Sequence, residues 1–89
     1  MKAVISVMGR DAIGIIHKVS EQCSKYDANI VDISQSVLKE FFTMVMVVEI
    51  DCLTIPFGDF VDVLNKLGKD NGLEIHTMHE DIFGAMHKI

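Results

Sequence analysis

Residues 41–51, FFTMVMVVEID, hold the pattern that decides the fold. Apolar side chains recur there at every second position and make one unbroken face of a β-strand, formed by Phe42, Met44, Met46, Val48 and Ile50. The preceding stretch, residues 30–38, also reads as a strand, and only Lys39 and Glu40 separate the two. Two residues are the commonest connection in a β-hairpin, so we predict that these stretches pair antiparallel.

A helix is predicted on each side of this hairpin. Between residues 14 and 26 the apolar side chains are spaced by three, four and three, which lines one helix face with Ile16, Val19, Cys23 and Tyr26. The same spacing predicts a second helix with Phe57, Phe60, Leu64 and Leu67 on its apolar face. Asp11 and Thr54 are candidate N-caps, Pro56 suits a first turn, and Gly72 suits the left-handed residue that ends the second helix.

Strands at both ends complete the order of elements. Residues 2–8 (KAVISVM) are rich in apolar and β-branched types, and residues 73–81 alternate between two faces. The order βαββαβ predicts an α+β, ferredoxin-like fold, with a four-stranded antiparallel sheet and two helices on one face. The 89 residues fit a single domain, 1–89, in which residues 82–89 form a C-terminal tail of unassigned structure.

The sheet face without helices is predicted to carry apolar side chains. Val45 and Val47 point to that face, opposite the apolar face of their strand. In the preceding strand we expect Val31, Ile33 and Val37 on one face and polar residues on the other. Exposed apolar sheet surface or strand edges usually mark a partner, so we expect a homodimer or a higher oligomer.

Composition and charge exclude several classes of protein. The chain is 49% apolar and 24% charged, which fits a packed globule. Its net charge of −5 disfavours binding to a phosphate backbone, and no exposed aromatic set typical of RNA-binding sheets is apparent, so no nucleic-acid partner is expected. No apolar run is long enough to span a bilayer, no signal peptide is apparent, and we expect a cytoplasmic protein without a membrane partner.

No catalytic set or cofactor motif emerges from the sequence. Cys23 lies on a helical apolar face, where a buried inert thiol is the usual interpretation. His76 and His79 are three apart in a predicted strand and point to opposite faces, so a shared metal would need His87 or a second chain. We therefore predict a protein that is not an enzyme, with no cofactor and no resident metal.

The junction between the first strand and its helix is the segment with functional character. It reads Gly-x-Asp-x-x-Gly from Gly9 to Gly14. Gly9 allows close backbone approach, the helix start offers unpaired N–H groups to a carboxylate, and Arg10 could add a charged contact. From the residues alone, a merely capped turn is an equally good interpretation.

Two motifs together resemble a known family. Residues 9–16 (GRDAIGII) and residues 28–35 (ANIVDISQ), at these places in βαββαβ, are similar to an ACT domain over the whole chain. The resemblance is closest to small stand-alone prokaryotic ACT proteins of the UPF0237-like group, similar to the N-terminal half of the glycine cleavage system repressor.

The resemblance implies a regulatory module that binds an amino acid or another small effector at an interface between two domains. One domain supplies backbone donors from the glycine loop, and its neighbour supplies the second segment. Carried over to this chain, the implied ligand-binding residues are Gly9, Arg10, Asp11, Ala12, Ile13, Gly14, Ile15, Asn29 and Ile30. Many members of the family have Pro where this chain has Ile13, so the loop here lacks a fixed φ.

Three functions remain open at this stage. The first is an effector-binding regulatory module that acts as a homodimer. The second is an assembly domain that binds a protein partner and retains only a vestigial pocket. The third is a metal-responsive module that uses His76, His79 or His87.

Overall fold

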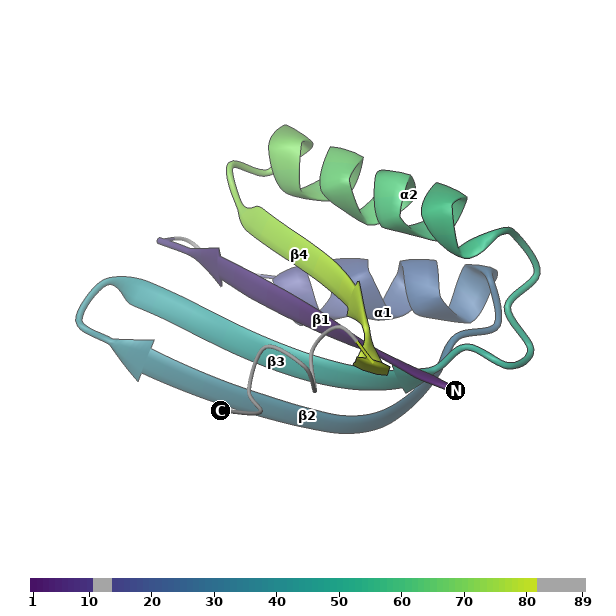
Figure 1. The fold of residues 1–89 in the computed structure, drawn as a ribbon. Helices are drawn as coiled ribbons and strands as arrows, with labels where there is room; N and C mark the ends of the chain where they lie inside the picture. The colour runs from purple at the N-terminus through teal and green to yellow at the C-terminus, as the bar shows by residue number, and fades with distance from the viewer. Residues whose placement is uncertain (11–13, 82–89) are drawn as a thin grey trace.

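The computed structural model describes residues 1–10 and 14–81, and it confirms the predicted ferredoxin-like order. Figure 1 shows two layers, with both helices on one face of an antiparallel sheet. The strands lie in the order β2-β3-β1-β4, so β2 and β4 form the two edges. The elements are β1 (Lys2–Gly9), α1 (Ile15–Lys25), β2 (Asn29–Leu38), β3 (Phe41–Glu49), α2 (Phe57–Asp70) and β4 (Glu74–His79).

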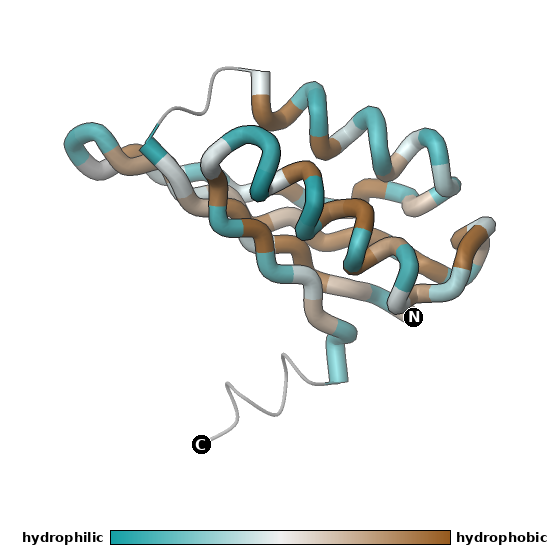
Figure 2. The backbone as a smooth tube through the Cα atoms, turned by 90° about the horizontal axis from the view of Figure 1, so that it is seen from above, coloured by the Kyte–Doolittle hydropathy of each residue, from teal (hydrophilic) through white to brown (hydrophobic). Residues whose placement is uncertain are grey.

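The core lies between the sheet and the helices. Figure 2 shows hydrophobic and hydrophilic residues alternating along both helices. The predicted alternation of β1 and β3 is confirmed, because their helix-facing side chains are buried: Ala3, Ile5, Val7, Phe42, Met44, Met46 and Val48. Each helix adds one stripe of buried side chains to the core. These are Ile15, Val19 and Cys23 on α1 and Phe60 and Leu64 on α2.

The ends of both helices differ from the predicted caps. The N-cap of α1 is Gly14, not Asp11, which itself lies outside the described residues. The N-cap of α2 is Pro56, not Thr54, and within residues 1–10 and 14–81 neither helix receives a side-chain cap hydrogen bond at its start. The predicted end of α2 is confirmed, since Gly72 follows it with a left-handed φ of 66°.

Two close approaches fix how β4 packs. A Cβ added at Gly68 of α2 would lie 2.8 Å from the carbonyl oxygen of Leu73 and 3.0 Å from Cγ1 of Ile75. A Cβ at Gly9 would overlap Cδ2 of Leu73. Glycine at these two positions therefore lets α2 and the end of β1 close around the residue that leads into β4.

The exposed apolar side chains lie only partly on the face that we predicted. Val45 and Val47, on the face without helices, are partly buried rather than exposed, and Val4 beside them is only 5% exposed. Met8 of β1, on the same face, is 52% exposed, and three more exposed apolar side chains lie on edge strand β2, where Val31 is 47%, Ile33 36% and Val37 70% exposed.

A β-bulge determines which residues of β2 face the helix side of the sheet. The register shifts between Ile30 and Asp32, so Ile30 pairs with Val48 and Ile33 pairs with Met46. Residues directly opposite each other share a face, so Ile33 and Val37 lie on the helix side with the core residues of β3. The helix layer does not cover this edge, and these side chains stay in solvent.

Candidate functional site

The candidate loop begins at the end of β1 and ends at the start of α1. Gly14 adopts a left-handed φ of 73°, a conformation that favours glycine, and its carbonyl accepts from the Lys18 N–H at 3.0 Å. The first turn of α1 carries no acidic side chain. Among the described residues no side chain caps the start of this eleven-residue helix, where the dipole favours an anion, and Ile15 of the predicted set is buried there.

Arg10 contacts the β2–β3 hairpin. Its guanidinium carbon lies 5.5 Å from the centroid of the Phe41 ring, and Nη2 lies 4.0 Å from Oε1 of Glu40. Glu40 lies in the Lys39–Glu40 turn predicted from the sequence, where Lys39 has a φ of 57°, and Phe41 begins β3 directly after it. Sequence reasoning missed Phe41 as a neighbour of the loop, although antiparallel pairing of the hairpin with β1 would have brought the two together.

The other predicted half of the site begins β2. Asn29 is exposed and Ile30 is partly buried. Asn29 lines an open hollow of about 350 Å³ together with Ser24, Asp27, Ala28 and Cys52. Cys52 was not among the predicted site residues, and the sequence pattern gives no signal that would have placed it there.

The two halves lie at opposite ends of the sheet. Gly9 pairs with Phe42, whereas Asn29 pairs with Glu49 at the far end of β3. Seven residues of strand (49 − 42) separate those positions, or about 23 Å at about 3.3 Å per residue. One chain cannot bring Gly9 and Asn29 to the same small molecule. Asp11, Ala12 and Ile13 of the predicted set lie outside the described residues.

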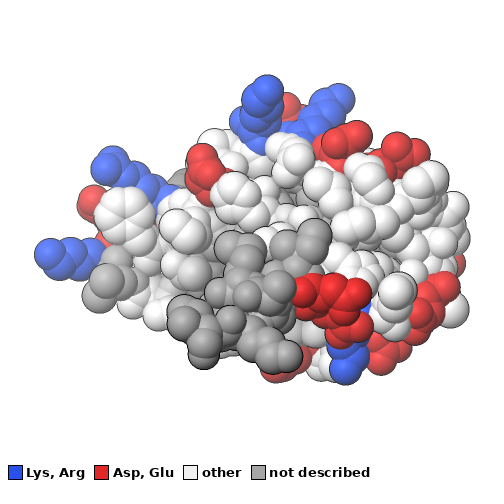
Figure 3. Space-filling view, viewed as in Figure 1, with Lys and Arg blue, Asp and Glu red and all other residues white. Residues whose placement is uncertain are grey.

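Charge is distributed unevenly between these two ends. Figure 3 shows cationic side chains projecting beyond the hairpin end of the sheet, with acidic side chains gathered at the opposite end. The hairpin end carries the cations Arg10 and Lys39 beside the single acid of the turn, Glu40, whereas Glu49 and Asp51 lie near the Met1 ammonium at the other end. The Met1 ammonium donates a 2.8 Å hydrogen bond to the Asp51 carboxylate. This hydrogen bond is the largest cause that raises the pKa of the ammonium.

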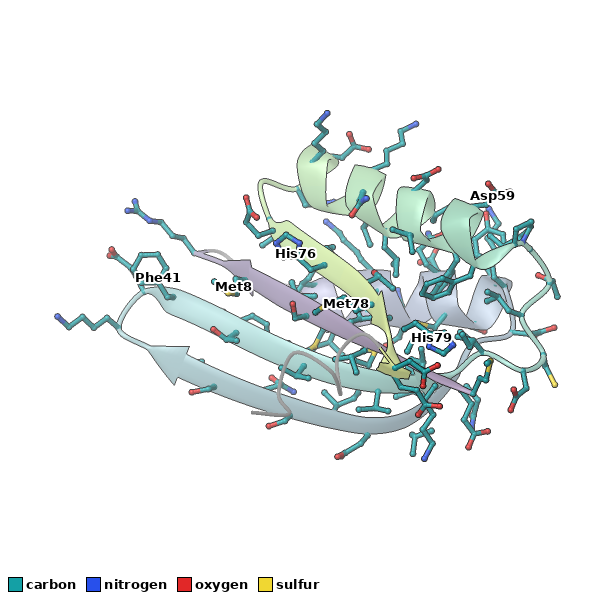
Figure 4. The ribbon with its side chains drawn as sticks, viewed as in Figure 1. Met8, Phe41, Asp59, His76, Met78 and His79 are labelled. Atoms are coloured by element: carbon teal, nitrogen blue, oxygen red, sulfur yellow. The ribbon has the colours of Figure 1, made fainter. Side chains whose placement is uncertain are left out.

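The histidines of β4 face opposite ways, as the sequence predicts. His76 pairs with Ser6 on the face without helices, and His79 pairs with core residue Ala3 (Figure 4). Nε2 of His76 lies 3.2 Å from Oε2 of Glu74. Within residues 1–10 and 14–81, no three His, Cys, Asp or Glu side chains are grouped to hold a metal ion.

The two cysteines differ in environment. Burial raises the pKa of the Cys23 thiol to about 11, so this thiol is a poor nucleophile at neutral pH. Cys52 is exposed, and both cysteines are free. Among the described helices, none is long and apolar enough to cross a membrane.

A comparison with protein families matches residues 2–78 to the ACT domain. The chain belongs to the ACT domain family. ACT domains are regulatory modules that bind small molecules, and the predicted resemblance is thereby confirmed. Among curated relatives, UPF0237 protein CPE1496 of Clostridium perfringens is 39% identical over 89 residues, covering all of both chains. UPF0237 protein MMP0657 of Methanococcus maripaludis is 41% identical over 86 residues, covering 97% and 96%.

Solved structures agree with this assignment to the ACT family. The ACT domain protein from Streptococcus pneumoniae superposes with a TM-score of 0.81 at 37% identity, covering 93% of each chain. A putative glycine cleavage system transcriptional repressor gives a TM-score of 0.69 at 23% identity, covering 85% of this chain and 43% of that one. At that identity the second likeness shows the fold alone.

Proposed function

We propose that this ACT domain is a non-catalytic regulatory module that binds a small effector, an amino acid by its chemistry, between two copies of the chain. The observation that carries the proposal is the separation of the two half-sites along β3. A twofold axis that runs two copies antiparallel brings the glycine loop of one copy to Asn29 of the other. Each dimer then contains two equivalent sites.

Edge strand β2 is the surface that we assign to this contact. Its ten residues include a single charged side chain, Asp32, and no Pro or Lys. Natural sheets usually protect free edges with such residues, so this long edge is suited to pairing. An antiparallel β2–β2 contact covers Ile33 and Val37, and it sets the cationic hairpin end of one copy toward the acidic end of its partner.

The chemistry of the two half-sites favours an amino acid. The start of α1 offers N–H groups and a positive dipole end to a carboxylate. The partner's segment offers the Asn29 amide, beside Asp27 in the hollow at the other end of the sheet, where an ammonium group is stabilised. A ligand that binds only across the interface stabilises the dimer by mass action.

The first test is a thermal-shift screen of the purified chain with the twenty amino acids, followed by calorimetry on any that respond. We expect at least one to raise the melting temperature and to bind one molecule per chain. A folded dimer that responds to none of them supports the assembly-domain alternative instead.

Mixing two defective variants tests whether the site is shared. Gly14→Ala impairs the loop half, and Asn29→Ala impairs the other half. In a mixed dimer, one site combines the intact loop of the Asn29→Ala chain with the intact Asn29 of the Gly14→Ala chain. We expect neither variant alone to bind and the mixture to recover up to one ligand per mixed dimer. No recovery in a verified heterodimer contradicts a shared site.

A further inference from the structure

A histidine and a thioether meet at the end of the sheet far from the glycine loop. Nε2 of His79, the last residue of β4, lies 3.4 Å from Sδ of Met1. The His79 side chain is only 20% exposed, and its ring stands edge-on to Phe57 at 6.1 Å between centroids. Figure 4 shows His79 at the end of β4 beside the start of β1, apart from Met8 and Phe41.

The Met1 main chain and the His79 ring are each fixed by hydrogen bonds. The Met1 carbonyl accepts from the Ile50 N–H at 3.0 Å, and the Met1 ammonium donates to Asp51 at 2.8 Å. On the other side of the imidazole ring, Nδ1 of His79 accepts from the Asp81 N–H at 3.2 Å, with Oδ2 of Asp81 at 3.6 Å. The Met1 main chain and the imidazole are thus held by separate partners, while the Met1 side chain is 65% exposed and within reach of an ion from solvent.

We propose that Met1 Sδ and His79 Nε2 form a binding site for a soft monovalent metal ion, Cu(I). Thioether sulfur selects Cu(I), imidazole nitrogen also binds it, and this ion accepts low coordination numbers. The site lacks the clustered oxygen and thiolate donors that hard divalent ions and structural zinc use, at least among the residues described. The proposal is independent of effector binding, which involves the loop and Asn29.

Binding of the ion requires a change of tautomer at His79. The Asp81 N–H donates to Nδ1 in the metal-free chain, so the ring proton sits on Nε2 and points at Met1 Sδ. Metal on Nε2 moves that proton to Nδ1, where the Asp81 carboxylate is the nearest acceptor. A carboxylate behind the ring is the usual arrangement that orients a metal-binding histidine.

The test is anaerobic Cu(I) titration of the full chain in competition with bicinchoninate. Every variant carries Cys52→Ser, because an exposed thiol would itself bind Cu(I). We expect one Cu(I) per chain, and loss of even an outer partner of such a ligand weakens affinity by about 10–100-fold. His79→Gln should therefore weaken it by at least about tenfold, whereas His76→Gln, on the opposite face of the same strand, should leave it unchanged.

Two further measurements keep the proposal testable if His79→Gln folds poorly. Met1→Leu removes the thioether at similar volume, and this variant is produced behind a cleavable tag. Its control is the chain with Met1, produced with the same tag and carrying the same residues left by cleavage. Nitrogen NMR of the imidazoles should show the His79 proton shift from Nε2 to Nδ1 on adding Cu(I). The proposal is overturned if the chain takes no Cu(I) from bicinchoninate, or if His79→Gln or Met1→Leu binds as tightly as its control.

Discussion

The guanidinium of Arg10 lies over the ring of Phe41, 5.5 Å from its centroid. This contact ties the first described residue after β1 to the tip of the β2–β3 hairpin. A cation–π pair at an exposed site contributes about 0.5–1 kcal/mol. We expect a double-mutant cycle of Arg10→Gln and Phe41→Leu, measured by urea unfolding, to give a coupling energy in that range. Glu40→Gln, which removes a 4.0 Å surface ion pair, should change stability by less than about 0.5 kcal/mol.

Gly68 and Gly58 lie in the same helix and should respond oppositely to alanine. An added Cβ at Gly68 meets the Leu73 carbonyl oxygen, whereas one at Gly58 meets nothing within 4 Å. Alanine favours helix by up to about 1 kcal/mol, and overpacking costs about 1–3 kcal/mol. Gly58→Ala should therefore raise the unfolding free energy, and Gly68→Ala should lower it by about 1–2 kcal/mol. Stabilisation by both would contradict the close packing of α2 on β4.

Gly14 should tolerate only residues that accept a left-handed backbone. Because its φ is 73° and no described atom lies within 4 Å of its Cβ position, we expect the cost of substitution to come from the backbone rather than from a clash. We expect Gly14→Ala to destabilise the chain by about 1–2 kcal/mol and Gly14→Asn to cost less, since Asn visits this region more readily. Equal effects of the two variants in thermal unfolding would indicate a different loop conformation.

The thiols should react with Ellman's reagent at very different rates. Cys52 is exposed, whereas Cys23 is buried and its pKa is raised to about 11. At pH 8 we expect one thiol per native chain to react quickly and the second only after unfolding. The raised pKa also means that the folded state holds this proton more tightly, so its contribution to stability is lost as pH rises from about 8.5 toward 11. Cys23→Ala should flatten the pH dependence of stability in that window.

Self-association should depend on the helix-side face of β2. Val37→Lys places a charge in the proposed β2–β2 contact, and Ser36→Lys places the same charge one residue away on the other face. We expect light scattering coupled to size exclusion to show dimers for the native chain and for Ser36→Lys, and monomers for Val37→Lys. Dimers for both lysine variants would move the interface away from this edge.

The period-two pattern of β3 was enough to predict the centre of the fold. The two-residue Lys39–Glu40 turn set the hairpin, and the spacing from Phe60 to Leu64 identified the buried face of α2. Local signals failed where the backbone departs from regular geometry. The bulge after Ile30 changes which residues of β2 share a face. The alternation of apolar and polar residues in the sequence does not predict this bulge.

The candidate site was less accessible to sequence reasoning than the fold. The left-handed Gly14, rather than a polar side chain, begins α1, so the usual preference for Asp at an N-cap pointed to Asp11. The sequence also gives no measure of distance between Gly9 and Asn29, which depends on strand order and register. That separation becomes visible only when both residues are paired with β3.

In the dimer that we propose, the placement of the half-sites at the two ends of β3 has a consequence for effector sensing. A receptor assembled from two molecules captures its ligand in proportion to the square of the monomer concentration when the chain is dilute. The abundance of the chain then sets the threshold of the response, so a modest change in expression would retune the sensor without altering a single contact.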